Sequence, residues 1–173
     1  MESFEEILTA GGHSNSLGRA GEVLDTVRGD TSRLDELFSC ISADDAWVRM
    51  RAIDTFEKLV KDKPEVVQPY LPTIFSNLTK SSQPSIQWHL AQIFSEVEFT
   101  TKQRSEAIAW LKNAVMTTNV DWIVSVNVMK ALLYFHQNGF IAANDIAPLY
   151  KVQEGHVSKS VRKKAASLLA ALQ

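Results

Sequence analysis

The sequence predicts an all-α protein built from stacked helix pairs, and three observations lead to this fold class. The composition is that of a globular domain, 45% hydrophobic and 22% charged, with only 7 Gly and 5 Pro. Apolar residues follow a helical spacing over residues 45–60, which gives that stretch one apolar face. Similar stretches recur at intervals of 38, 38 and 37 residues, headed by Val48, Ile86, Val124 and Val161. A period of this length is typical of stacked helix pairs.

A second series of apolar residues has the same period. It marks the first helix of each pair, at intervals of 37, 37 and 38 residues: Leu34, Leu71, Ile108 and Ile146. The two series together predict four pairs within a repeat region over residues 31–173, at about 31–62, 64–98, 101–138 and 142–173. The second helices are expected at 45–61, 84–97, 121–137 and 158–172.

Capping and turn residues support these boundaries. Asp45 and Asp121 stand where an N-cap side chain would accept from free backbone amides. Pro72 and Pro148 are expected near the starts of first helices, because proline in a helix interior removes a hydrogen bond. Asn138–Gly139 is the expected C-terminal stop of the helix at 121–137.

Residues 1–30 do not follow this period and are predicted to form an N-terminal helical cap. Helices are expected at 3–10, where Ser3 begins a capping-box pattern, and at 17–28, with a mobile loop over 11–16 between them. A stacked array needs such a cap, because its first repeat would otherwise expose an apolar face.

Charge is unevenly distributed, although the net charge is only −2. Residues 1–40 carry eight acids and three bases, whereas from residue 151 onward five bases accompany the single acid Glu154. The basic end is either an ordinary solvated helix or a surface for an acidic partner.

Cys40 is the only cysteine, so no internal disulfide forms, and its apolar neighbours predict a buried thiol. A lone thiol fits a reducing compartment, and no apolar run reaches the ~20 residues that cross a bilayer. The expected location is cytoplasmic, without membrane contact.

The residues at the heads of the second helices resemble the HEAT-repeat family. Its signature is an acid, then Val-Arg, then a small residue, as in Asp45, Val48–Arg49 and Ala52. Val161–Arg162 repeats the pattern without the acid, whereas Ile86–Gln87 and Val124–Ser125 keep only the apolar head. The resemblance implies a right-handed α–α superhelix, armadillo-like, whose second helices line a concave face. Scaffolds, adaptors, transport factors and a few enzymes share this fold.

Stepping along the second helices by the period gives the candidate partner-binding residues on this concave face. They are Met50, Arg51, Trp88, His89, Asn127, Lys130, Lys163 and Lys164. One row, at residues 51, 89, 127 and 164, has a donor in every repeat and no acid. Trp88 is either an aromatic anchor for a peptide or a side chain packed into the next pair. The segment 122–135 is apolar on more than one side, so it is either covered all round or exposes a patch.

No catalytic constellation is apparent, so the protein is expected to be a non-enzymatic scaffold or adaptor. Its expected partner is a protein or peptide, and the donors on the concave face suit an acidic one. The four histidines lack zinc-ligand spacing, Cys40 has no evident base, and no phosphate-binding loop is present, so neither metal nor cofactor is expected. The alternative is a nucleic-acid-binding HEAT-like protein related to alkylpurine DNA glycosylases. That family uses tryptophans and an essential aspartate, but the inner rows offer only Asp54.

Overall fold

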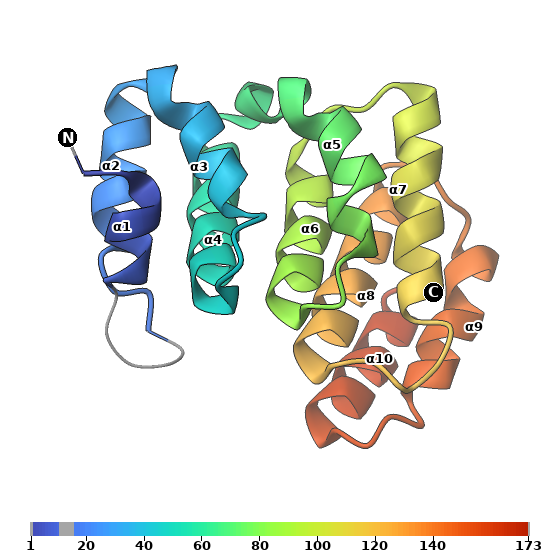
Figure 1. Cartoon of the computed structure of the whole chain (residues 1–173). Helices are drawn as coiled ribbons and strands as arrows, with labels where there is room; N and C mark the ends of the chain where they lie inside the picture. Colours follow the sequence, from blue (N-terminus) through green and yellow to red (C-terminus); the bar gives the residue numbers. More distant parts are fainter. Residues whose placement is uncertain (1, 11–15, 173) are drawn as a thin grey trace. The chain divides into compact units, whose positions relative to one another are not determined.

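A computed structural model describes residues 2–10 and 16–172, and over these residues every regular element is helical (Figure 1). The chain divides into two compact units, Met1–Pro69 and Tyr70–Gln173. The expected N-terminal cap and the first expected pair belong to unit 1, and the α-helices of the three later pairs belong to unit 2. The all-α fold class is therefore confirmed.

Unit 1 is arranged around its longest helix. Its α-helices are α1 (Phe4–Thr9), α2 (Ala20–Gly29), α3 (Leu34–Cys40) and α4 (Ala46–Asp62), with a 3-10 turn η1 (Thr31–Arg33) before α3. Helix α4 packs against α1, α2 and α3. The expected cap helices thus cover α4, and they bury Phe4, Leu8, Val23 and Val27 completely.

The local signals of unit 1 are largely confirmed. Ser3 forms the capping box with Glu6, and the Asp45 carboxylate accepts from Trp47 N at 2.6 Å and Val48 N at 3.2 Å. Helix α2, however, begins at Ala20 and not at residue 17, because Gly18 has φ 52° and cannot continue a right-handed helix. The expected loop over 11–16 lies outside the described residues, apart from residue 16.

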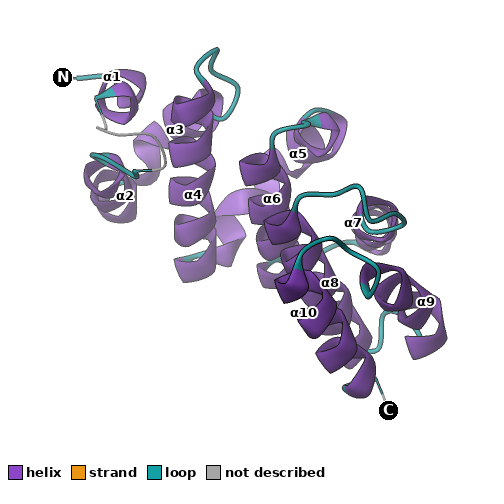
Figure 2. Ribbon diagram, turned by 90° about the horizontal axis from the view of Figure 1, so that it is seen from below, coloured by secondary structure: helices purple, strands orange, loops and turns teal. Residues whose placement is uncertain are grey.

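Unit 2 is a two-layer arrangement of helix pairs. A 3-10 segment η2 (Pro64–Tyr70) lies at the unit boundary, and η3 (Leu78–Lys80) follows α5. The α-helices are α5 (Leu71–Ser76), α6 (Pro84–Glu96), α7 (Thr101–Ala114), α8 (Trp122–Gln137), α9 (Ala143–Gln153) and α10 (Lys159–Ala170). Helix α8 packs against α6, α7, α9 and α10. Figure 2 shows α6, α8 and α10 side by side in one layer, with α5, α7 and α9 in the other.

All but one of the residues that define the two apolar series belong to the core. The four second-helix heads are buried to 1% exposure or less. Among the first-helix heads, Leu34, Leu71 and Ile146 are buried, but Ile108 is only half-buried. The prediction for α7 is wrong at Ile108, because Ala107 faces the core in its place, together with Leu111 one turn later.

The ends of the helices show one confirmed stop and one misplaced proline. Helix α8 ends in a Schellman motif, in which Gly139 at φ 77° donates to His136 O and Phe140 N donates to Phe135 O. The Phe135 and Phe140 rings add the apolar contact usual for this motif, with centroids 6.3 Å apart. Pro72 lies in the first turn of α5 as expected. Pro148 lies inside α9 and not at its start, on an exposed side of the helix.

A recurring hydrogen bond braces the loop before three of the second helices. Arg49 Nη1 donates to Ala43 O at 2.7 Å, Gln87 Nε2 to Ser81 O at 2.9 Å, and Arg162 Nη1 to His156 O at 2.7 Å. Each side chain follows the buried head and reaches the carbonyl six residues earlier. The position therefore has the same local role in both units.

In the pair formed by α7 and α8, another side chain braces the loop. Ser125 is too short, and its hydroxyl donates to Gln153 Oε1 at 2.9 Å. The Gln153 amide in turn donates to Val115 O at 2.9 Å and Thr117 O at 2.7 Å. The contact thus passes from the second helix of this pair to the first helix of the next.

Candidate protein-binding surface

Two of the predicted partner-binding residues are buried and cannot contact a partner in this structure. Arg51 is 2% exposed, and its guanidinium donates to Leu8 O at 2.5 Å and Ser16 O at 2.8 Å. Leu8 lies in the last turn of α1, where carbonyls lack partners within the helix. Arg51 therefore satisfies the end of α1, and the prediction that it lies on a binding surface is wrong.

His89 is the second correction. Its side chain is 1% exposed, and its ring stacks on that of Trp88 with centroids 3.4 Å apart. Trp88 itself is half-buried. Trp88 is therefore neither fully packed into the next pair nor fully exposed.

The remaining predicted residues of unit 2 lie at equivalent positions on three neighbouring helices. We define the open face of unit 2 as Trp88 and Gln92 of α6, Val126, Asn127 and Lys130 of α8, and Lys163 and Lys164 of α10. A hydrogen bond ties two of these helices together there, from Gln92 Nε2 to the Asn127 amide oxygen at 3.2 Å. Lys130 and Lys163 are exposed and the other members half-buried. Met50 is half-buried on α4 and belongs to unit 1.

The charge on this layer is strongly one-sided. Helices α6, α8 and α10 carry five cationic side chains and the single acid Glu96, at the end of α6. In the described part of the chain, no carboxylate lies within ion-pair distance of Lys130, Lys163 or Lys164. The positive charge of these lysines is not offset by neighbouring carboxylates. The electrostatic potential of the face therefore favours anionic groups.

Helix α8 exposes aromatic side chains beside these lysines. Trp122 is 52% and Tyr134 36% exposed, while Val126 and Leu133 are half-buried. Of the two alternatives for residues 122–135, the structure thus favours the exposed apolar patch. Aromatic residues surrounded by polar groups are typical of protein interfaces.

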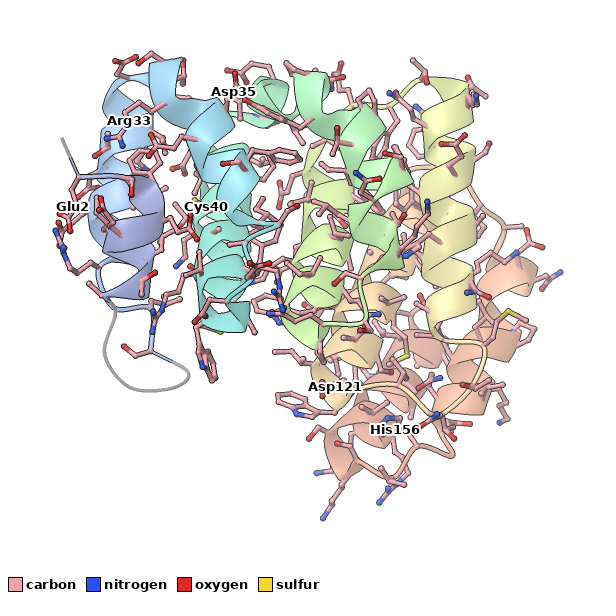
Figure 3. The ribbon with its side chains drawn as sticks, in the orientation of Figure 1. Glu2, Arg33, Asp35, Cys40, Asp121 and His156 are labelled. Atoms are coloured by element: carbon pink, nitrogen blue, oxygen red, sulfur yellow. The ribbon has the colours of Figure 1, made fainter. Side chains whose placement is uncertain are left out.

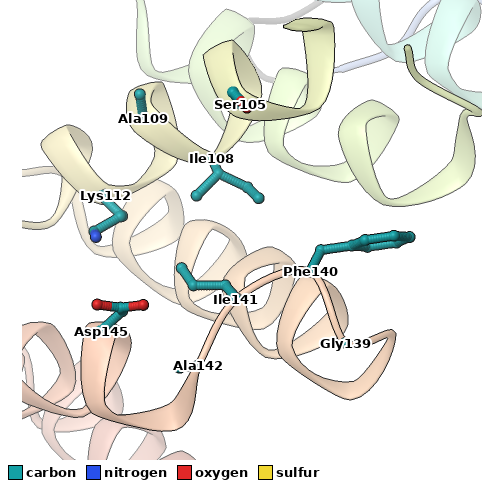
Figure 4. A pocket seen from close by; sticks show the side chains of 9 residues that line it. All are labelled: Ser105, Ile108, Ala109, Lys112, Gly139, Phe140, Ile141, Ala142 and Asp145. Atoms are coloured by element: carbon teal, nitrogen blue, oxygen red, sulfur yellow. The ribbon is translucent and has the colours of Figure 1, made fainter. Parts of the chain in front are cut away.

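Two hollows of unit 2 lie on the other layer, and sequence reasoning did not identify them. One, of about 570 Å³, is lined by Ile108 and Lys112 of α7 and by Phe140, Ile141 and Asp145 from the segment that enters α9 (Figure 4). Its centre is apolar, and Figure 4 shows Lys112 and Asp145 at the same end. The left-handed Gly139 turn is the signal that places this segment against α7.

Neither nucleophilic nor metal chemistry is indicated by the described residues. Burial raises the pKa of the Cys40 thiol to about 11, with smaller contributions from Glu5 and Glu36, so the thiolate needed for attack is scarce at neutral pH. In residues 2–10 and 16–172, no group of three or more His, Cys, Asp or Glu side chains is placed to hold a metal ion.

Comparison with known proteins adds no relative: no family model, curated protein or solved structure matches the chain. Within the described ranges, the helices fall short of the length and apolarity that a membrane span requires.

Proposed function

We propose that the protein is a non-enzymatic scaffold or adaptor of HEAT-like architecture, which binds an acidic segment of another protein on the open face of unit 2. Each helix pair of an α-solenoid contacts only its neighbours, so the second helices line one continuous surface. That surface is here formed by α6, α8 and α10.

Three features support the HEAT-like part of this proposal. The buried heads recur with one period in both units. The side chains of Arg49, Gln87 and Arg162 brace the preceding loop in the same way. Unit 2 places first and second helices in separate layers. A repeat that shares core positions and a loop contact is a structural unit and not merely a compositional period.

The observation that carries the binding proposal is the set of lysines without carboxylate partners beside a half-exposed tryptophan. Lys130 and Lys163 lie at the open face with Trp88, and Tyr134 is exposed on the same helix as Lys130. Complementary charge accelerates encounter and selects the partner, while an aromatic anchor contributes most of the affinity.

The test is affinity capture from the native source followed by mass spectrometry, with charge-reversed bait proteins. Lys130→Glu/Lys163→Glu is expected to lose a specific acidic partner that wild type retains. Lys102→Glu is the control, because this α7 lysine is 88% exposed and lies on the other layer. A partner set that is identical for wild type and the double variant would remove the open face as the binding site.

The cation excess on this layer also makes nucleic acid the second candidate ligand. Phosphate contacts give affinity that falls steeply with salt. A gel shift of duplex DNA at low and high salt separates the two functions. A salt-sensitive shift that the lysine double variant abolishes would favour nucleic acid, and no shift at micromolar protein would dismiss it.

A further inference from the structure

The loops that precede α8 and α10 are joined to each other at one end of unit 2. Gln153 donates to Val115 O and Thr117 O of the first loop. His156 Nε2 lies 2.9 Å from Val120 O, and His156 Nδ1 accepts from Ser158 N at 2.9 Å, so Nε2 carries the ring proton and donates. Figure 3 shows Asp121 and His156 at this same end.

These bonds hold exposed apolar side chains in place. Val157 is 89% exposed, although its neighbour His156 is only 2% exposed, and Arg162 Nη1 fixes Val157 O at 2.8 Å. Trp122 is 52% and Met116 58% exposed, on and beside the first loop. A rigid loop that presents apolar groups to solvent loses little conformational entropy when a partner covers them.

Cations of α10 follow Val157 directly in the chain. Lys159, Arg162 and Lys163 are exposed and lie within the first two turns of α10. In the described residues, Lys159 and Lys163 have no carboxylate at ion-pair distance, and the nearby Glu154 pairs with Lys151 at 3.2 Å. Cations near the start of a helix are repelled by the positive end of its dipole, so they do not stabilise the free chain. They would instead stabilise a complex in which an acidic ligand lies beside them.

We infer that these two joined loops form a second docking surface, for an acidic peptide segment of a partner protein that carries apolar side chains between its carboxylates. We call it the loop-end surface and define it as Met116, Trp122, Val157, Lys159 and Arg162. The apolar side chains bind the apolar residues of the segment, and the cations bind its carboxylates. The inference does not rest on the open face: Lys163 is the one residue of that face that enters the argument, and the loop-end surface is defined without it.

The probe is a fluorescent twelve-residue peptide with glutamates on both sides of a Leu-Phe pair. Two matched peptides replace the glutamates with lysine or the Leu-Phe pair with Gly-Gly. Anisotropy should show the acidic apolar peptide binding at least about tenfold more tightly than either of the others. No binding of the acidic apolar peptide, or equal binding of all three peptides, would overturn the inference.

Lys159→Glu separates binding from folding. An acid in the first turn of α10 interacts favourably with the helix dipole, so the melting temperature should hold or rise. Peptide affinity should nevertheless fall about fivefold or more. The matched control is Lys102→Glu, the same charge change in the first turn of α7, which should bind the peptide like wild type. Equal affinities for both variants would contradict the proposed surface.

Amide chemical shifts of the full chain then locate the peptide. The largest changes are expected in residues 115–122 and 154–163. Changes concentrated at residues 88–92 and 126–134 would place the peptide on the open face, which would refute the loop-end surface while leaving the proposed function intact.

Discussion

The two units satisfy their charges in opposite ways. In unit 1, the arginines of the N-terminal region pair with acids of the same unit. Arg19 lies 2.8 Å from both Glu2 and Glu22, and Arg33 lies 2.7 Å from Glu36. Arg33 also stacks on the Phe4 ring, 3.9 Å from its centroid, while Glu36 accepts from Phe4 N at 2.7 Å. The charged groups of unit 1 therefore join its helices to one another.

Unit 2 joins its helices with neutral groups. Tyr150 donates to Met129 O at 2.8 Å, Trp110 Nε1 to Thr79 O at 2.9 Å, and Gln153 connects α9 with the loop before α8. Its lysines on α8 and α10 take no part in this network. The comparison indicates that unit 1 uses its charges to join its helices, whereas the lysines on α8 and α10 of unit 2 have no carboxylate partner in the described residues.

The largest expected effect tests whether the units fold as separate cores. Val124 is fully buried in α8, so Val124→Asp places an unpaired carboxylate in the core of unit 2. We expect its free energy of unfolding to fall by about 4 kcal/mol or more. Calorimetry should show the unit 2 transition lost and the unit 1 transition retained.

The control for this prediction is Ala166→Asp, at an exposed position of α10. It should change stability by no more than about 1 kcal/mol, the scale of the helix propensity difference between Ala and Asp. If Val124→Asp instead melts within a few degrees of wild type, α8 does not form the centre of unit 2. Loss of both transitions together would show that the two units fold cooperatively.

The sequence predicted the helices well because their core positions repeat. A head such as Val48 or Val161 is read from spacing alone, since every second helix must bury the same face. The error at Ile108 shows the limit of this reasoning, because spacing does not fix the rotation of a helix to within one residue. The first short helix of residues 1–30 was predicted from its capping box, and the second from apolar residues at helical spacing.

The candidate site was predicted less well, because long polar side chains can turn in either direction. Arg51 turns inward only because the end of α1 presents a free carbonyl there, and α1 lies outside the period. Val157 is exposed because the buried His156 fixes the loop around it. Gln153 and His156 are polar residues beside an apolar core, which indicates that they need hydrogen-bond partners. Residue spacing alone does not identify those partners.

A smaller effect concerns the buried arginine of unit 1. Arg51→Met keeps much of the apolar stem and removes both donors, which leaves the Leu8 carbonyl buried without its hydrogen bond. We expect unit 1 to lose about 2 kcal/mol, measured by urea unfolding. Arg51→Lys, which retains a cationic donor, should lose less. Equal stability of wild type and Arg51→Met would show that the Arg51 hydrogen bonds contribute little to the free energy of unfolding of unit 1. The charges of unit 1 would then join its helices only through ion pairs at the surface.

The smallest expected effect is a difference in acid sensitivity between the units. Hydrogen bonds from Arg33, helped by Phe4 N–H, hold the pKa of Glu36 below its ordinary value of 4.5, and Arg19 lowers the pKa of Glu22 in the same way. A carboxyl group whose pKa is lower in the folded state stabilises the fold fully above its unfolded pKa, and this contribution is lost as the pH falls toward the folded value. The unit 1 transition should therefore move to lower temperature between pH 5 and pH 3 more than the unit 2 transition does. Glu36→Gln should reduce this shift of the unit 1 transition, because it removes the titrating group. Equal shifts of both transitions in wild type would contradict the contrast between a unit joined by charges and a unit joined by neutral hydrogen bonds.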